Sequence, residues 1–492
     1  MTERRAWIGI AIVVALSVVR VAMTHRVLAQ TSDEHLHLIA GYDVLTRHSW
    51  RTDLHHPPLA RVFFALPFLD TPPPPGDDRS WRGNELLFGD GQYTRNLARA
   101  RMGNLLFLAL GIVFVARWAM RILSPAAGLA AGALFAMLPP VLAHGGLATT
   151  DMVVTAMMAF ALDEASQLLE APTWRRGVMC GLAVGLGVLS KYSFLVFFPA
   201  AAVGVLLGLL MKRRADGGVR PSIVALLIAA GVTVVIVFAG FGFSFRPLID
   251  GILDVRRHNV GGHRNFLFGE LRWPGWWYYF PIAIFFKTPI PFLTLMLAGC
   301  ALLLRRRPEV PLSALAILGV AMASNINIGI RHILPMYPAL AIAAAAPIVL
   351  MPRLRIAHAL LVAWLFVDGV GAHPDYLAWF NGFARHPEQI LNDSNLDWGQ
   401  DVLRLARYAR RERLPFLSLL VFTSADVERL GFPPHKVITS VDEPVHGWFA
   451  VSEMEIAIGE THSERVQRWL DGLIAGKPYK RIGKSIRLYD LP

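Results

Sequence analysis

Long apolar runs recur along this chain of 492 residues, and they restrict its fold more than any other feature. The hydrocarbon core of a bilayer is about 30 Å thick, so a helix needs roughly 20 apolar residues to cross it. Several runs reach that length, and only 17% of the residues are charged. A soluble domain of this size would need more charge to cover its surface. The sequence therefore predicts a helical polytopic membrane protein.

Eleven apolar segments are candidate spans. They are Ala6–Met23, Ala98–Ala116, Ala126–Leu142, Met152–Leu162, Gly177–Leu189, Tyr192–Met211, Ile223–Phe243, Trp276–Leu304, Leu312–Ala323, Ile333–Met351 and Ile356–Val370. The fourth, fifth and ninth are short. The first also has features of a cleaved signal peptide, but the many later spans favour an uncleaved helix. The two cysteines lie inside apolar runs and indicate neither a disulfide framework nor a zinc site.

Basic residues gather in short loops at alternate span ends. These loops contain Arg4 and Arg5, Arg117 and Arg121, Arg175 and Arg176, the run Met211–Arg220, Arg305–Arg307, and Arg353 with Arg355. Because short cytoplasmic loops carry an excess of positive charge, we expect the N-terminus inside and everything after Val370 outside. The net charge of +12 is explained by such loops and by contact with anionic lipid. The scattered arginines do not form the basic module that nucleic-acid binding needs.

The predicted organisation has two domains. Residues 1–372 form a transmembrane domain, whose outer loop 28–97 carries the densest cluster of titratable groups, and residues 373–492 form a small extracytoplasmic α/β domain. The tail has helical periodicity over Asp401–Leu414 and reads as strands at Phe416–Phe422, His435–Ser440, Trp448–Ile458 and Ser485–Leu491.

Asp33 and Glu34 directly follow the first span, at the outer membrane surface on this topology. His37 lies three residues after Glu34, hence on the same helical face. Two acids beside a histidine can serve as a general base or bind a divalent cation. The alternative is that Asp33 only caps the next helix. Because ionisable groups at a membrane edge are costly to keep without a partner, we favour a functional pair.

Asp151, in the turn His144–Asp151, begins the fourth span at the same outer face. A helix cap is an equal alternative for this acid.

Cations point to the same face from several segments. Arg61 follows two prolines at the start of a helical segment, and Lys191 separates two apolar runs. Lys287 lies in an aromatic, apolar stretch, and Arg331 lies at another outer end. A helix start signal and a snorkelling lysine are the alternatives for Arg61 and Lys191. Acids that abstract a proton and cations that hold a leaving phosphate predict a glycosyl-transfer site, whereas a transporter would place such groups near the midplane.

An ordered set of motifs resembles one known family. The set is DEHLHLIAGY (33–42), HHPPLAR (55–61), AHGGLATTD (143–151), LSKYS (189–193), WWYYFPIAIFFKTPIP (276–291), IRHILPMYP (330–338) and the stretch 376–408. It resembles bacterial GT-C superfamily membrane glycosyltransferases of the protein O-mannosyltransferase-like, phospholipid carrier-dependent branch. The resemblance implies a GT-C fold with about 11 transmembrane helices in the bacterial cytoplasmic (inner) membrane. It also implies a polyprenyl-phosphate sugar donor, used on the extracytoplasmic face.

The resemblance also assigns roles to residues. Asp33 maps to the catalytic base, with Glu34 beside it and Asp151 as a further catalytic acid. The candidate donor-phosphate ligands are Lys287, Arg331, Arg61 and Lys191. Other site candidates are His37, His56, His263, Tyr278 and Tyr279. Metal dependence stays open, with Glu34, His37 and His263 as candidate ligands of a divalent ion.

Two features depart from the family or lack a role. Eukaryotic-type relatives have an aspartate one residue closer to the prolines than Asp53, and a lysine in place of Arg61. The stretch Ser394–Asp401 resembles the start of the family's outer domain, and the sequence assigns no mechanism to it.

The expected activity is transfer of a hexosyl or mannosyl-type sugar, with inversion, to a hydroxyl of a protein, lipid or glycan. The alternative function is a polytopic lipid or solute transporter, which predicts paired half-repeats that the sequence lacks.

Overall fold

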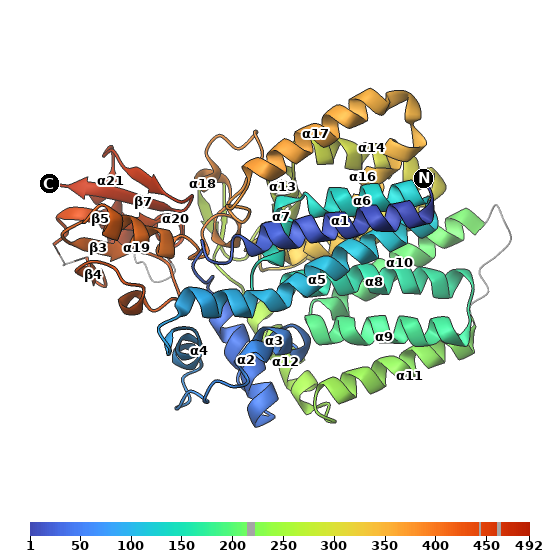
Figure 1. The fold of residues 1–492 in the computed structure, drawn as a ribbon, viewed down its shortest axis with the longest axis horizontal. Helices are drawn as coiled ribbons and strands as arrows, with labels where there is room; N and C mark the ends of the chain where they lie inside the picture. The colour runs from blue at the N-terminus through green and yellow to red at the C-terminus, as the bar shows by residue number, and fades with distance from the viewer. Residues whose placement is uncertain (214–221, 442–443, 460–463) are drawn as a thin grey trace.

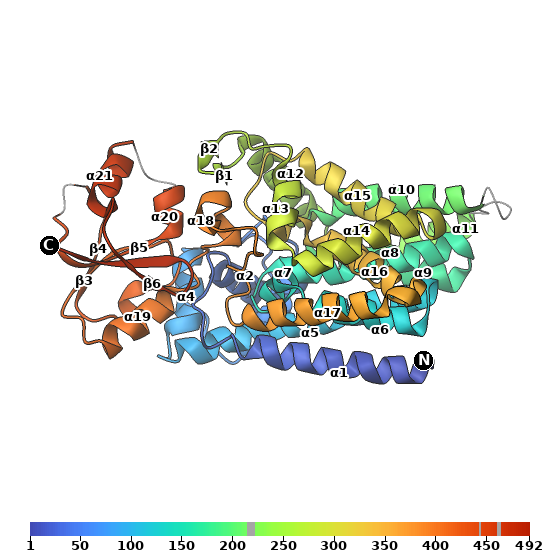
Figure 2. The ribbon, with the colours of Figure 1, turned by 90° about the horizontal axis from the view of Figure 1, so that it is seen from above.

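The computed structural model describes residues 1–213, 222–441, 444–459 and 464–492. A long helical body adjoins a small sheet with flanking helices (Figure 1). The N-terminus lies at the far end of the helical body, and the C-terminus lies at the opposite end of the molecule, in the sheet region (Figures 1 and 2). The predicted basic loop Met211–Arg220 lies largely outside the described residues.

The helices of the body run from α1 to α17, and the C-terminal region holds α18 to α21. Their bounds are α1 Glu3–Ala22, α2 Glu34–Arg47, α3 Pro58–Ala65, α4 Arg79–Phe88, α5 Tyr93–Ile122, α6 Pro125–Ala136, α7 Pro139–Gly145, α8 Thr150–Glu170, α9 Trp174–Ser190, α10 Phe194–Arg213, α11 Ile223–Gly240, α12 Arg246–Gly261, α13 Tyr279–Lys287, α14 Ile290–Arg306, α15 Glu309–Met322, α16 Tyr337–Leu350, α17 Arg355–Gly371, α18 Pro387–Ile390, α19 Val402–Arg411, α20 Glu453–Ala457 and α21 Glu464–Ile474. Two 3₁₀ helices matter for the site, η2 Ile330–Met336 and η4 Asp393–Asn395.

Each of the eleven predicted spans overlaps a helix, but the predicted count of about eleven exceeds what helix length supports. Among the described residues, seven helices are long and apolar enough to cross a membrane, or eight if the bent pair α6 and α7 is one span. The predicted spans at α9, α14 and α15 have helices of only 17, 17 and 14 residues. The chain is nevertheless a multi-pass membrane protein.

Proline explains where two predicted spans are broken. The span Ala126–Leu142 bends by 71° between α6 and α7, next to Pro139 and Pro140. The span Trp276–Leu304 is interrupted between α13 and α14, at Thr288 and Pro289. Proline has no backbone N–H and clashes with the preceding turn, so it favours a kink or a break in a helix.

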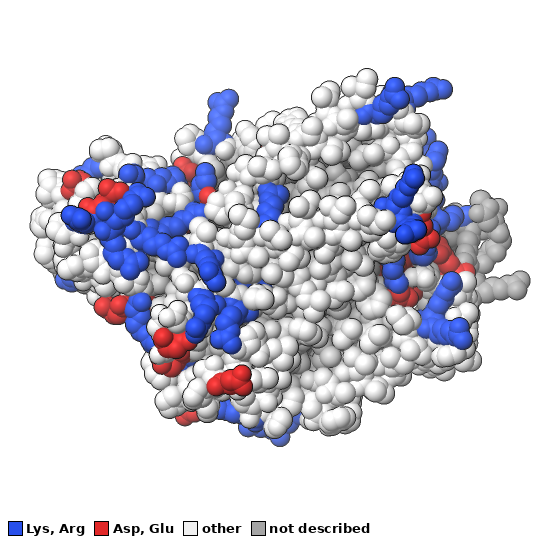
Figure 3. Space-filling view, viewed as in Figure 1, with Lys and Arg blue, Asp and Glu red and all other residues white. Residues whose placement is uncertain are grey.

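Burial separates central helices from those at the periphery. In the apolar windows of α8 and of the η2–α16 segment, 89% and 83% of residues are buried, against 11% for α11 and 17% for α17. Apart from Arg355 at the start of α17, the side chains that α11 and α17 expose are apolar, and one face of the body has a broad belt with few charges between two charged ends (Figure 3). The belt matches the hydrocarbon layer of a membrane. Because most of their residues are buried, α8 and η2–α16 lie inside the helix bundle.

The fourth predicted span, Met152–Leu162, is shorter than the helix that forms there, because charged residues interrupt its apolar run. Helix α8 continues for two more turns beyond Leu162, and the buried Asp163 and Glu164 pair with Arg117 and Arg121 of α5. A buried charge is tolerated where an opposite charge compensates it.

The C-terminal region contains a five-stranded sheet of order β4-β3-β5-β7-β6. The strands are β3 Leu417–Leu420, β4 His435–Val437, β5 Gly447–Ser452, β6 Lys480–Ile482 and β7 Ile486–Leu491. Strand β3 is parallel to β4 and β5, while β7 is antiparallel to β5 and β6. The α/β character is thus confirmed, although the predicted strand Trp448–Ile458 ends at Ser452 and continues as α20. The domain boundary after residue 372 stays a prediction.

Opposite ends of the helical body should lie on opposite sides of the membrane. Trp81 of α4 and Trp174 of α9 are 47% and 62% exposed, at the two charged ends. We expect a membrane-impermeant maleimide to label Trp81→Cys in intact cells, and Trp174→Cys only after the membrane is opened. The parent protein, whose two cysteines are buried or half-buried, is the control. The reverse labelling pattern would contradict the predicted orientation.

Candidate active site

Asp33 lies where the chain leaves α1 and enters α2. It occupies the position before the first turn of α2, yet its side chain makes no capping hydrogen bond. Its carboxylate instead accepts a hydrogen bond from Arg331 Nη1 at 3.1 Å. The Asp33 side chain is 31% exposed, so it can meet a substrate. The capping alternative for Asp33 is therefore wrong.

Arg331 connects Asp33 to the rest of the cluster. It belongs to η2, at the start of the segment that continues into α16. Its Nη1 lies 3.9 Å from Asp151 Oδ2, and its Nε donates to Ser394 Oγ at 3.1 Å. The guanidinium also lies over the ring of Trp398, 4.2 Å from the ring centroid. One arginine thus bridges two acids at the mouth of the bundle.

Asp151 is fully buried in the first turn of α8. Its Oδ1 accepts from Lys191 Nζ at 2.5 Å, and its Oδ2 has no hydrogen-bond partner. His144 Nδ1 lies 3.9 Å from the same Oδ2. Lys191 is therefore an ion-pair partner and not a snorkelling lysine, and Asp151 pairs with Lys191 instead of capping α8.

Glu34 makes a different kind of contact from its neighbour Asp33. Both carboxylate oxygens accept hydrogen bonds from Arg101 of α5, at 2.8 and 2.7 Å, and the pair is about 1% exposed. Glu34 also accepts from the backbone N–H groups of Thr31 and Ala148. Burial alone would raise the pKa of Glu34, but the charge and hydrogen bonds of Arg101 lower it below its usual value. Glu34 therefore holds the loop around Asp33, with no oxygen left for a substrate.

The stretch Ser394–Asp401 wraps around the same loop. The backbone N–H groups of Ser32 and Ala29 donate to the carbonyls of Trp398 and Gln400. Gly399 has a φ of +89°, in the left-handed region that favours glycine, where this stretch turns. Farther along, Asp401 accepts from the backbone of Lys484 and Ser485, near β7. The stretch thus ties the C-terminal sheet region to Asp33.

His37 and His56 lie behind the acids, with ring centroids 4.8 Å apart. Burial lowers the pKa of His37 to about 4, although the charge of Asp33 opposes it. Burial also lowers the pKa of His56 far below its usual value. Both rings are neutral at pH 7, and the Nδ1 atom of each is buried without a hydrogen-bond partner. They can offer hydrogen bonds without charge.

Other predicted candidates have separate positions. Tyr279 is buried and accepts a hydrogen bond from Asn395 Nδ2 at 2.9 Å, whereas Tyr278 is 37% exposed and packs edge-on against Trp277. His263 lies in the loop after α12, against His258.

Two of the four predicted phosphate ligands are engaged elsewhere. Lys287 is buried, and its Nζ donates to three backbone carbonyls, those of Leu377, Trp379 and Asn395. Arg61 is buried and donates to the carboxylate and carbonyl of Asp53 at 2.7 and 2.9 Å. Among the predicted cations, Arg331 and Lys191 are the ones that lie with the acids.

The candidate metal ligands do not form a site. All of the contacts of the Glu34 carboxylate go to Arg101 and to hydrogen-bond donors of the protein. In the described part of the chain, no three His, Cys, Asp or Glu side chains are arranged to hold a metal ion.

Sequence reasoning missed three residues of this region. Arg101 lies inside a predicted span, and an arginine in an apolar run should have indicated a buried acidic partner. Trp398 belongs to the stretch Ser394–Asp401, to which the sequence assigns no mechanism. Asp393, next to Ser394, has a φ of +57°, and burial raises its pKa to about 6 despite the charge of Arg331. No sequence signal points to Asp393, because its setting depends on tertiary contacts.

Known proteins share this fold. Residues 91–241, less than a third of the chain, match the family of dolichyl-phosphate-mannose-protein mannosyltransferases. The crystal structure of ArnT from Cupriavidus metallidurans bound to undecaprenyl phosphate is similar, with a TM-score of 0.55, 16% identity, and 98% of each chain covered. Its apo state has a TM-score of 0.53 and 15% identity, over 99% of this chain and 98% of that one. No curated protein is significantly similar in sequence.

Lys287 should matter for stability through its three carbonyl contacts. In Lys287→Met the apolar stem is kept, but three backbone carbonyls lose their donor, two in buried and one in a partly buried contact, each at a cost of about 1 kcal/mol. We expect a clear fall in the thermal unfolding midpoint in detergent, and none for Lys484→Met, a matched change at an exposed lysine. An unchanged midpoint for Lys287→Met would reopen its assignment as a phosphate ligand.

Proposed function

Because this chain has the fold of the GT-C membrane glycosyltransferases, we propose that it moves a sugar from a polyprenyl-phosphate-linked donor to an acceptor hydroxyl. The observation that carries the proposal is the contact between Asp33 and Arg331, with Asp151 and Lys191 behind them. It pairs a partly exposed carboxylate with a cation on one surface. Such a pair can remove a proton and stabilise a leaving phosphate.

Position along the bundle supports a donor that is anchored in the bilayer. Asp151 and Arg331 are each the second residue of a candidate membrane span, so they lie at the end of the apolar belt. A polyprenyl chain stays in the hydrocarbon, and its phosphate reaches only the interface. The reacting carbon therefore lies close to side chains at the ends of the membrane-spanning helices. A transporter would need such groups near the midplane, so this arrangement does not favour the transporter alternative.

The proposed reaction is a single displacement. Asp33 accepts the proton of the acceptor hydroxyl as its oxygen attacks the anomeric carbon, and the bond from that carbon to the phosphate oxygen breaks. The polyprenyl phosphate leaves with the bonding electrons, and attack from the opposite face inverts the anomeric configuration. Arg331 stabilises the charge that develops on the phosphate, and Lys191 keeps Asp151 ionised to hold Arg331 in place.

The finer assignments are proposals of the same kind. Undecaprenyl phosphate, which the ArnT structure contains, supports a donor of this class. A hexosyl or mannosyl-type sugar is proposed from the family that matches residues 91–241. The bacterial inner membrane, with the N-terminus inside and the site outside, completes the proposal. Asp33 and Asp151 are proposed as catalytic residues, and Arg331 and Lys191 as the cations of the donor site.

Asp33→Asn tests the proposed base. The amide keeps the shape of the side chain but cannot take up a proton, so we expect cleavage of a polyprenyl-phosphate sugar to fall by about 10²–10⁴. Thermal stability should change little, since Asp33 makes no capping bond and its ion pair with Arg331 is partly exposed to solvent, while the amide oxygen of asparagine can still accept from Arg331. Asp70→Asn, at an exposed acid of the same loop, is the control. Near-normal turnover by folded Asp33→Asn would remove the catalytic assignment.

Glu34→Gln should behave in the opposite way. It breaks a buried ion pair and leaves Arg101 uncompensated, which typically costs about 3–5 kcal/mol. We expect a large fall in the unfolding midpoint, measured by thermal denaturation beside Asp33→Asn. Equal stability of the two variants would contradict a structural role for Glu34.

A further inference from the structure

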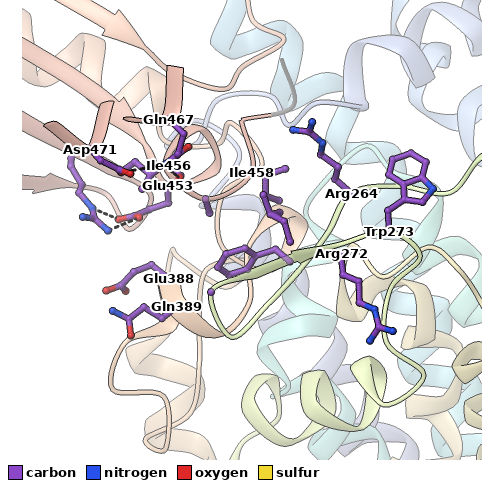
Figure 4. A pocket seen from close by; sticks show the side chains of 15 residues that line it. Arg264, Arg272, Trp273, Glu388, Gln389, Glu453, Ile456, Ile458, Gln467 and Asp471 are labelled. Atoms are coloured by element: carbon purple, nitrogen blue, oxygen red, sulfur yellow. Dashed lines mark hydrogen bonds and ion pairs between the residues drawn. The ribbon is translucent and has the colours of Figure 1, made fainter. Parts of the chain in front are cut away.

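A cavity of about 780 Å³ lies between the hairpin β1–β2 and the C-terminal region. The hairpin consists of β1 Asn265–Leu267 and β2 Glu270–Arg272. Figure 4 shows its two walls. One carries Arg264, Arg272 and Trp273, and the other carries Glu388, Gln389, Glu453, Gln467 and Asp471. We call this space the hairpin pocket, and the proposed reaction assigns it no role.

The hairpin pocket is connected to the candidate active site by a short piece of chain. Asn392 Nδ2 donates to the carbonyl of Glu453, a wall residue, at 2.8 Å. Two residues later, Ser394 accepts from Arg331. Two residues span at most about 7 Å, so the pocket wall and the Arg331 cluster are close neighbours.

The walls of the pocket are built by folded contacts. Phe266 of β1 packs in an apolar cluster with Met454 and Ile458 of the C-terminal region. The backbone N–H of Phe268 donates to the carbonyl of Ile390, beside the wall residues Glu388 and Gln389. The pocket therefore exists only when the hairpin and the C-terminal region are docked together.

The charges of the lining argue against a phosphate. Three arginines, Arg264, Arg272 and Arg487, face three acids, Glu388, Glu453 and Asp471. Arg487 is also bound to both oxygens of Glu453, at 2.7 and 2.8 Å. A phosphate group would meet as many acids as bases, so the pocket does not suit the headgroup of the lipid-linked donor.

The lining instead suits a neutral ligand with many hydroxyls. Trp273 is 59% exposed and offers an aromatic face, while Ile456 and Ile458 add apolar surface. Carboxylates and amides opposite, such as Asp471 and Gln389, can pair with hydroxyls as acceptors and donors. Pockets of this kind combine apolar area for affinity with a few polar groups for orientation.

We propose that the hairpin pocket binds the acceptor and that the acceptor is a saccharide, with Trp273 against a sugar face and Gln389 and Asp471 on its hydroxyls. This inference rests on the proposed function and selects one of its three acceptor classes. A peptide that binds by main-chain pairing would need a long free strand edge. The edge strands of the large sheet, β4 and β6, contribute nothing to the lining, and the hairpin strands β1 and β2 that do line it have only three residues each. A lipid acceptor would need the apolar belt, whereas this pocket lies in the region beyond it.

The test uses the purified full-length protein in detergent with two readouts. The first is direct binding, by isothermal titration, of short oligomers of glucose, galactose, mannose and N-acetylglucosamine. The second is cleavage of a polyprenyl-phosphate sugar, alone and with each oligomer, with a serine-containing peptide or with a lipid carrying a free hydroxyl. The variants are Trp273→Ala and Gln389→Ala. The matched control is Trp277→Ala, a 67% exposed tryptophan outside the pocket.

We expect one oligomer class to bind and to accelerate cleavage, and Trp273→Ala to raise its Kd and KM about tenfold or more, with Trp277→Ala unchanged. The rate of donor cleavage without acceptor, in which water attacks the sugar, should be the same in all variants. The inference is overturned if no oligomer binds, if peptide or lipid alone accelerates cleavage, or if Trp273→Ala binds like the wild type. Failure of the wild type to cleave any donor would instead contradict the proposed function, and the binding readout would still decide the inference.

Discussion

The buried ion pair between Glu34 and Arg101 is the interaction on which the site depends. Arg101 donates to both oxygens of Glu34 and to the carbonyls of Leu28 and Ala29, in the turn after α1. The same carboxylate accepts from Ala148, three residues before Asp151. One pair thus fixes the two chain segments that carry Asp33 and Asp151. Since each charge would be costly to bury alone, the pair forms only when α2, α5 and the turn before α8 are assembled.

Around this pair, charge is concentrated at one end of an apolar body. Arg331 reaches Asp33 and Asp151 from η2, and Trp398 covers its guanidinium. The stretch that carries Trp398 also ties the C-terminal sheet region to the loop before Asp33. The C-terminal region is therefore part of the site's framework. Lys287 contacts this stretch through the carbonyl of Asn395, and its other two acceptors are the carbonyls of Leu377 and Trp379.

The sequence predicted what apolar runs and charge positions determine. It predicted a helical membrane protein with helices at all the apolar runs, the α/β tail, and Asp33 with Asp151 on one surface, whereas the GT-C fold was implied by the resemblance of the motifs to a known family. The family resemblance marked Asp33 as the base, but the residue pattern alone treated Asp33 and Glu34 as one functional pair, because the ion pair of Glu34 with Arg101 follows from tertiary contacts. It also assigned Lys287 and Arg61 to phosphate, since backbone carbonyls and Asp53 as partners follow from tertiary contacts. Helix lengths were misjudged where ion pairs extend α8 and where prolines break two spans.

The central claim is that Arg331 is shared between Asp33 and the phosphate of the donor. Binding of undecaprenyl phosphate to the purified protein tests it most directly, because no sugar or acceptor needs to be known. The account predicts that Arg331→Gln weakens binding at least about tenfold, as expected for loss of a charge-assisted contact. Asp33→Asn should bind as well as the wild type or more tightly, because the competing carboxylate is gone. Equal affinity of Arg331→Gln and the wild type would contradict the account.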